Sequence, residues 1–122
     1  MAISQYQRKE LNKLLREVML LRDKHRCLRC GGTEKLQMSH IFPKGKYRKM
    51  AYDIDNVKTF CYSCHFHFWH KNPVEAKTWL ESIIEKKRFQ RLILSSQTID
   101  KRPLDYKLIK LELEQIKKQF VY

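Results

Sequence analysis

A helical pattern of hydrophobic residues opens the chain. Apolar side chains recur at intervals of three and four, which is typical of one face of an amphipathic helix. They are Leu11, Leu14, Leu15, Val18, Met19 and Leu21. We expect this helix to run from about Gln5 to Asp23 with Ser4 as its N-cap. Its opposite face is basic, which suits a solvated surface at least as well as a DNA contact. The apolar face is expected to pack on the cysteine-containing middle of the chain.

The middle of the chain alternates in the manner of two short strands. Residues 35–40 alternate apolar and polar side chains, and residues 57–60 form a second short run that predicts the returning antiparallel strand. Between them, Pro43 and Gly45 favour a loop that extends to about Asp55. A short helix is expected to begin near Tyr62.

More helix is predicted after this segment. Asn72 as N-cap, Pro73 at the first helical position and Glu75 at the third form a capping-box pattern. One apolar face follows, made of Ala76, Trp79, Leu80, Ile83 and Ile84. The far end of the same helix is basic, with Lys86, Lys87, Arg88 and Arg91, and residues 95–98 end it. After Pro103, apolar residues at helical spacing predict a last helix to about Val121.

These elements predict an α+β, mostly helical fold, in which two strands and a short helix are flanked by N- and C-terminal helices. A chain of 122 residues has room for one small domain with little apolar core. We divide this expected domain, residues 1–122, into an N-terminal helix (1–26), a central core (27–72) and C-terminal helices (73–122).

Charge narrows the choice of partner. The net charge is +13, which suits a polyanion, although basic proteins also bind acidic membranes. Residues 35–52 contain no acid, and the loop after His40 carries Lys44, Lys46, Arg48 and Lys49. No apolar run is long enough to cross a bilayer, and early charge argues against a secretory leader. We therefore expect a soluble, cytoplasmic protein with no membrane partner.

All four cysteines occur as two CxxC pairs, Cys27 with Cys30 and Cys61 with Cys64. Two such pairs supply the four thiolates that a tetrahedral structural zinc ion prefers. Free thiols or a redox CxxC motif are the alternatives, but both matched pairs would then be coincidental. A zinc ion with four thiolate ligands has no open position, so it stabilises the fold and does not catalyse.

Between and beside these pairs lie His40, Asn56 and His65, in that order. Histidine, asparagine and histidine interleaved with two CxxC pairs resemble the zinc-containing HNH endonucleases of the ββα-metal superfamily, over about Cys27 to Trp79. The stretch from Cys64 to Glu75, with Trp79, is more narrowly similar to the phage NinG recombination endonucleases. The HNH resemblance implies a ββα-metal finger held by the four-cysteine zinc knuckle, and hydrolysis of DNA phosphodiester bonds in a bacterial or phage-infected cell.

The resemblance also implies residue roles. His40 corresponds to the general base, Asn56 to the residue that holds the loop of that histidine, and His65 to a ligand of one catalytic divalent metal, which would be Mg²⁺, Mn²⁺, Ni²⁺ or Zn²⁺. An isolated strand-end histidine would more often bond to backbone, and an asparagine after Asp53 and Asp55 also suits an ordinary Asx turn. The basic loop residues named above are candidates for DNA binding, although a solvated loop is the alternative.

One position departs from the family. Many relatives have a metal-binding aspartate just before the base histidine, and this chain has Ser39, a poor ligand for a hard cation. His67 and His70 are candidates to complete the metal shell. His65 and His70 are five residues apart, about 140° around an α-helix, so a regular helix would not aim both at one ion. Water and a DNA phosphate, or a distorted helix end, are the alternatives.

Four aromatic residues near the second cysteine pair have two interpretations. Phe66, Phe68, Trp69 and Trp79 could stack on bases, but beside a zinc knuckle we interpret them as packing. For the whole chain, the main alternative to a nuclease is a non-catalytic zinc module that binds nucleic acid. A second alternative is a protein-interaction adaptor that docks through its last helix.

Overall fold

The computed structural model describes residues 2–98 and 101–120 and has two strands among five longer helical segments. In chain order these are α1 (Gln5–Arg22), β1 (Leu36–His40), β2 (Val57–Cys61), the π-helix η3 (Cys64–Trp69), α2 (Pro73–Ile83), α3 (Lys86–Gln97) and α4 (Tyr106–Lys118). Two short 3₁₀ turns, η1 (Arg48–Met50) and η2 (Ile54–Asn56), interrupt the loop between the strands. The predicted fold class is confirmed: the protein is mostly helical, and helices flank a ββα region that contains the clustered cysteines.

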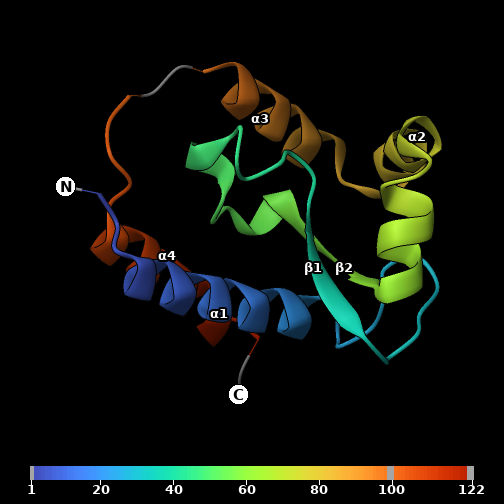
Figure 1. Ribbon diagram of the computed structural model, residues 1–122, viewed down its shortest axis with the longest axis horizontal. Helices are drawn as coiled ribbons and strands as arrows, with labels where there is room; N and C mark the ends of the chain where they lie inside the picture. Colours follow the sequence, from blue (N-terminus) through green and yellow to red (C-terminus); the bar gives the residue numbers. More distant parts are fainter. Residues whose placement is uncertain (1, 99–100, 121–122) are drawn as a thin grey trace.

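The two strands form an antiparallel pair at the centre of the molecule (Figure 1). Leu36 lies opposite Cys61, and His40 lies opposite Val57. Because side chains alternate between the faces of a strand, Val57 and Phe60 point to opposite faces of the hairpin. Each belongs to a different buried cluster, so the hairpin separates two small cores.

The first core lies between the hairpin and the paired helices α1 and α4 (Figure 1). Leu15 and Met19 of α1 pack there with Val57 and Leu113. The two helices run parallel, since Lys110 pairs with Glu10 and Lys117 pairs with Glu17. The apolar face of α1 therefore packs on the Val57 end of the hairpin, within the cysteine-containing middle of the chain as expected, and also on α4, which was not predicted as its partner. The buried cysteines themselves belong to the other core.

The end of α1 is tied to the hairpin by a charged pair. Arg22 donates to the carbonyl oxygens of Ile54 (2.6 Å) and Val57 (2.7 Å), and Asp23 accepts from the backbone and hydroxyl of Thr59. Burial raises the pKa of the Asp23 carboxyl, but the Arg22 and Thr59 donors outweigh it and hold that pKa below its ordinary value of 3.8.

The second core is aromatic. Phe60 is fully buried, and its ring lies 5.4 Å from that of Trp69 and 5.9 Å from that of Trp79. Cys27 and Cys64 are buried in the same cluster. The metal-binding cysteines and the tryptophans therefore share one packing unit.

Two predictions about the helices after residue 72 are wrong. The single helix expected there is two helices, because Ile84 and Glu85 are extended (ψ 142° and 130°). This break turns α3 back over the strand-connecting loop, where Arg91 donates to Asp53 and Asp55. The capping box at Asn72 is also absent, since the side chain of this residue donates to the His67 carbonyl.

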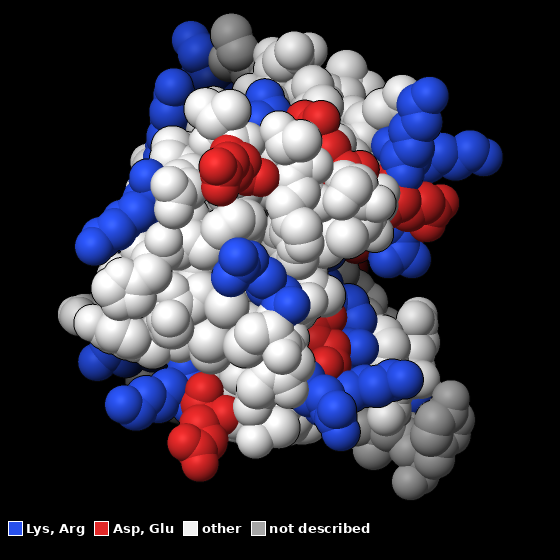
Figure 2. Space-filling model, turned by 90° about the vertical axis from the view of Figure 1, so that its right-hand side faces the viewer, with Lys and Arg blue, Asp and Glu red and all other residues white. Residues whose placement is uncertain are grey.

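The remaining helix predictions agree with the structure. Ser4 and Gln7 form a reciprocal capping box at the start of α1. The described part of α4 ends at Lys118, and the predicted end at Val121 lies outside the described residues. No helix of residues 2–98 and 101–120 is long and apolar enough to cross a membrane. On the face that carries α2, basic and acidic side chains are interspersed (Figure 2).

Candidate metal centre and candidate active site

The four cysteines converge at the end of the hairpin farthest from His40. Their sulfur atoms all lie within 4.8 Å of one another, and the Sγ atoms of Cys30 and Cys61 are 3.7 Å apart. A tetrahedron of sulfurs about 2.3 Å from a zinc ion has edges of about 3.8 Å. The four thiols therefore suit one structural zinc ion, as the CxxC spacing predicted.

The local backbone supports this arrangement. Gly31 has φ 77°, the left-handed conformation that the first knuckle needs and that glycine adopts without strain. Backbone N–H groups of Gly32 and Cys64 donate to the sulfurs of Cys30 and Cys61 (3.4 Å each). These donors stabilise thiolates, which are the metal-binding form of cysteine.

The thiol pKa values diverge within the cluster. Burial raises the pKa of Cys27, but backbone N–H groups of Cys30, Cys61 and Arg29 lower it to about 7. Burial and the adjacent thiols raise the pKa of Cys64 to about 12, although Arg29 lies against its sulfur. Thiolates that are packed together repel one another, so a divalent cation is the natural counter-charge for this site.

His40 ends β1 and is half-buried. Its Nε2 lies 2.9 Å from the Ala51 carbonyl oxygen, which accepts only if Nε2 carries the proton. The Nδ1 atom of the neutral ring then keeps its lone pair. Burial lowers the pKa of His40 below 6.5, and the charge of Lys44 lowers it further, although the Ala51 bond acts in the opposite direction. A neutral histidine with one fixed tautomer and a free lone pair can accept a proton near pH 7.

Asn56 bridges the two ends of the loop that follows His40. Its side chain is fully buried, accepts from the Phe42 N–H (2.8 Å), and donates to the carbonyl oxygens of Phe42 and Met50 (3.0 Å each). The nearby Asx turn is made by Asp53, whose side chain accepts from the N–H of Asp55. Asn56 therefore holds the loop backbone on which Ala51, the partner of His40, is carried.

The π-helix brings two histidines together. The His70 N–H donates to the His65 carbonyl, a hydrogen bond across five residues that places the second side chain over the first. The two Nε2 atoms are 3.0 Å apart, and the rings are 4.6 Å apart. The α-helical expectation of a 140° separation does not apply, because this segment has a π-helical hydrogen bond. The distorted-helix alternative is the one that the structure adopts.

Gln37 orients the first of these histidines. Its Oε1 lies 2.7 Å from His65 Nδ1, so Nδ1 is the donor and Nε2 faces His70 with a lone pair. Two nitrogens this close fit a cation at the usual distance of about 2.0–2.1 Å from each. Fixing the far ring nitrogen of a metal-binding histidine is a common role for a neighbouring polar side chain. The sequence pattern did not single out Gln37, because its contact with His65 joins residues 28 positions apart. Strand alternation places Gln37 on the same face of β1 as Ser39.

Ser39 is buried on β1, two residues after Gln37 and directly before His40. It is 2 % exposed, and its hydroxyl oxygen has no hydrogen-bond partner among the described residues. A buried hydroxyl without a hydrogen bond is energetically costly. The Ser39 hydroxyl is therefore a candidate to contact a polar group that binds at this site. It nevertheless adds no negative charge, and the cysteine cluster is the only group of three or more metal-ligating His, Cys, Asp or Glu side chains in residues 2–98 and 101–120.

The remaining predicted residues, which are the aromatic residues, His67 and the basic loop residues, lie in different environments. Phe68, Trp69 and Trp79 pack as expected, with the Arg29 guanidinium 3.9 Å above the Phe68 ring. Phe66 does not pack in the core: its residue surface is 40 % exposed, and its ring centroid lies 4.8 Å from that of Tyr62. The π-helix turns Phe66 outwards beside His65. His67 is exposed and near Tyr62, away from the His65–His70 contact. The four basic loop residues all line one cavity, described below.

A comparison with protein families places these features in context. The HNH endonuclease family model matches residues 27–67, the segment that contains both cysteine pairs, His40, Asn56 and His65. This match supports membership of the HNH family for that segment, and HNH domains generally act on DNA. No curated protein and no solved structure matched the chain.

Proposed function

We propose that this protein is a metal-dependent endonuclease that hydrolyses DNA phosphodiester bonds, with His40 as the general base. The observation that carries the proposal is the hydrogen bond from His40 Nε2 to the Ala51 carbonyl, which leaves Nδ1 to accept a proton. The lowered pKa of His40 keeps the ring neutral near pH 7. Its role is to take a proton from the water that attacks phosphorus.

His65 and His70 would hold the catalytic cation. Such a cation supplies the positive charge that stabilises the pentavalent phosphate and the leaving oxygen. Two imidazole nitrogens without a carboxylate suit zinc or nickel better than magnesium, which prefers oxygen ligands. Gln37 keeps the Nε2 atom of His65 unprotonated, and Asn56 keeps the His40 loop in place.

A non-catalytic nucleic-acid-binding module is the second candidate. Ser39 favours it, because a neutral hydroxyl stands where many HNH endonucleases have a metal-binding aspartate. A chain that keeps the zinc centre and the basic loop but binds no catalytic cation would bind DNA without cutting it. A role in phage recombination, and a cytoplasmic location, stay predictions that come from the sequence alone.

A plasmid-nicking assay tests the enzyme proposal. We expect wild-type protein to nick supercoiled DNA with added Zn²⁺, Ni²⁺ or Mn²⁺, and His40→Ala to lower the rate by about 10²- to 10⁴-fold, the usual contribution of a general base. Zinc content and DNA affinity should stay within a factor of two of wild type.

His67→Ala is the matched control, since it removes an exposed histidine of the same segment. It should cut at the wild-type rate. Zinc-loaded wild-type protein that binds DNA but leaves supercoiled, linear and branched substrates intact with every metal, magnesium included, would replace the enzyme with the binding module.

A further inference from the structure

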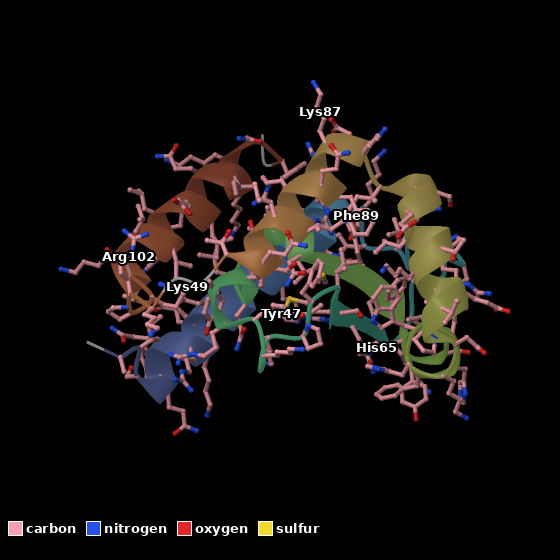
Figure 3. All side chains as sticks on the ribbon, turned by 90° about the horizontal axis from the view of Figure 1, so that it is seen from above. Tyr47, Lys49, His65, Lys87, Phe89 and Arg102 are labelled. Atoms are coloured by element: carbon pink, nitrogen blue, oxygen red, sulfur yellow. The ribbon has the colours of Figure 1, made fainter. Side chains whose placement is uncertain are left out.

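A large cavity lies beside the His40 loop. Its volume is about 1110 Å³, and four parts of the chain form its walls. They are the N-terminal part of α1, the loop of residues 44–52, the C-terminal end of α3 and the segment of residues 101–104. Figure 3 shows Lys49 of the loop and Arg102 of the segment after α3 close together on one side of the molecule. Residues about 50 positions apart in the sequence therefore meet at one wall.

The charged side chains among the described lining residues have one sign. The described residues that line the cavity include seven lysines and arginines and no aspartate or glutamate. The seven are Arg8, Lys44, Lys46, Arg48, Lys49, Lys101 and Arg102. The mixed charge on the α2 face contrasts with this (Figure 2). Basic walls around a hollow concentrate positive potential, which raises the local concentration of a polyanion.

The cavity adjoins the surroundings of His40. Ala51 lines the cavity, and its carbonyl accepts the hydrogen bond from His40. Lys44 also lines it, and the charge of this residue lowers the pKa of His40. The cavity therefore borders two residues that act directly on His40.

The C-terminal wall is attached to the loop. Lys49 Nζ donates to the Pro103 carbonyl oxygen at 3.4 Å, across 54 residues. Arg8 and Asn12 of α1 also line the cavity, together with Ala2 and Ile3. The remaining polar lining is made of hydroxyl groups, including those of Ser95 and Thr98, which can donate to phosphate oxygens.

We propose that this cavity is a track for the phosphate backbone of the DNA that flanks the scissile bond, and that Arg8, Lys101 and Arg102 extend the binding surface beyond the HNH segment. The inference rests on the proposed function. The substrate is then DNA long enough to reach from His40 to the 101–104 segment, held through its phosphates and without regard to sequence. A concave cavity admits a nucleic-acid strand, whereas a flat anionic membrane reaches only its rim.

A charge-matched pair of triple variants tests the track. The first is Arg8→Gln/Lys101→Gln/Arg102→Gln, and the control is Lys9→Gln/Lys86→Gln/Lys87→Gln, which removes the same charge from exposed residues outside the cavity. Lys87 points away from Lys49 and Arg102 in Figure 3. Both variants should keep zinc content and helix content.

Binding to a duplex of about 30 base pairs is measured by fluorescence anisotropy over a range of salt concentrations without added catalytic metal. We expect the cavity variant to lower the slope of log K against log salt by about 2 to 3, since each lost phosphate contact contributes about 0.9, and the control to lower it by less than about 1. On a duplex of about 8 base pairs, the salt slopes of the two variants should differ by less than they do on the duplex of about 30 base pairs.

Equal slopes for the two variants on the long duplex would overturn the track. Cavity-dependent binding of equal strength to phosphatidylserine vesicles or to polyglutamate at the same ionic strength would overturn the assignment to nucleic acid. Plasmid nicking is scored separately, so a wild-type protein that cuts nothing while the cavity variant loses slope would reject the enzyme and keep the track. Plasmid nicking by the wild-type protein, together with equal salt slopes for the two variants, would keep the enzyme and reject the track.

Discussion

The ring of His40 has a different environment at each nitrogen. One nitrogen is tied to the Ala51 carbonyl, and the half-buried ring lies near the charge of Lys44. Burial and this neighbouring cation both disfavour the protonated ring, so the folded protein keeps a base that is neutral at lower pH than an ordinary histidine.

The pH dependence of cleavage follows from this environment. A base works only when it is deprotonated, so the acid limb of the cleavage rate should have its midpoint below pH 6.5, the ordinary pKa of histidine. Lys44→Gln removes a cation that lowers this pKa and should move the midpoint towards 6.5. Single-turnover rates from pH 5 to 8 measure it, with Lys71→Gln as a control outside the cavity. An unmoved midpoint for Lys44→Gln would contradict the assignment of this limb to His40.

Asn56 is the other residue whose side chain acts on the loop. Asn56→Ala removes three hydrogen bonds and deprives the N–H and the carbonyl of Phe42 of their partner, whereas the Met50 carbonyl keeps its bond from the Asp53 N–H (3.3 Å). We therefore expect a loss of about 2–4 kcal/mol in the free energy of unfolding. Urea denaturation with zinc present measures this loss. Asn72→Ala is the control, because its exposed side chain makes one hydrogen bond and should cost less than about 1 kcal/mol. Equal losses for the two variants would show that the loop does not depend on Asn56.

At the scale of single elements, the π-helix η3 decides how the second cysteine pair connects to the histidines. A regular α-helix would point His65 and His70 in different directions, and the hydrogen bond across five residues aligns them. The same turn exposes Phe66 and leaves Phe68 buried. π-helical turns are rare in proteins, and those that occur often lie at functional sites. The role proposed for this turn agrees with that tendency.

Metal binding tests that role directly. Wild-type protein should bind one tight equivalent of zinc at the cysteines and a second, weaker equivalent at the histidines, and His70→Ala should lose the second while keeping the first. Equilibrium dialysis counts both. The cleavage defect of His70→Ala should be relieved in part by a higher metal concentration, as expected for a ligand. His67→Ala should bind both equivalents, and a second equivalent that survives in His70→Ala would place that metal elsewhere.

In the whole molecule, the hairpin holds two small cores that depend on different partners. The core on one face is closed by α1 and α4, and the core on the other contains Phe60, Trp69, Trp79 and the buried cysteines. A chain of this size buries little apolar surface, so we expect a structural zinc ion at the four cysteines to supply much of the stability of the second core.

Removal of zinc should therefore unfold the aromatic core. Both tryptophans of the chain lie against Phe60, so chelation of zinc, or Cys61→Ser, should shift their fluorescence to longer wavelength and lower the cooperativity of unfolding. Added zinc should restore the chelated wild type and not the variant. Ser63→Ala, at an exposed neighbouring position, should behave like wild type. Unshifted fluorescence after complete removal of zinc would show that the core is stable without metal.

Local patterns were sufficient for much of this protein. The spacing of the cysteines predicted that the four thiols meet, the alternation of residues 35–40 and 57–60 predicted the hairpin, and Ser4 marked the start of α1. Each of these depends on side chains that are close in sequence or on a ligand type with one preferred geometry. The order of His40, Asn56 and His65 among the cysteines indicated the HNH family, which the match to residues 27–67 supports.

Long-range packing decided the rest. The π-helical hydrogen bond at His70 and the break at Ile84 left no signal in the hydrophobic spacing, which continues across both positions. The partner of α1 and the basic cavity likewise require residues about 50 to 100 positions apart to meet, as Lys49 meets Pro103 and Glu17 meets Lys117. Sequence patterns carry the chemistry of single residues and short segments, and tertiary contacts alone determine which of those residues face one another.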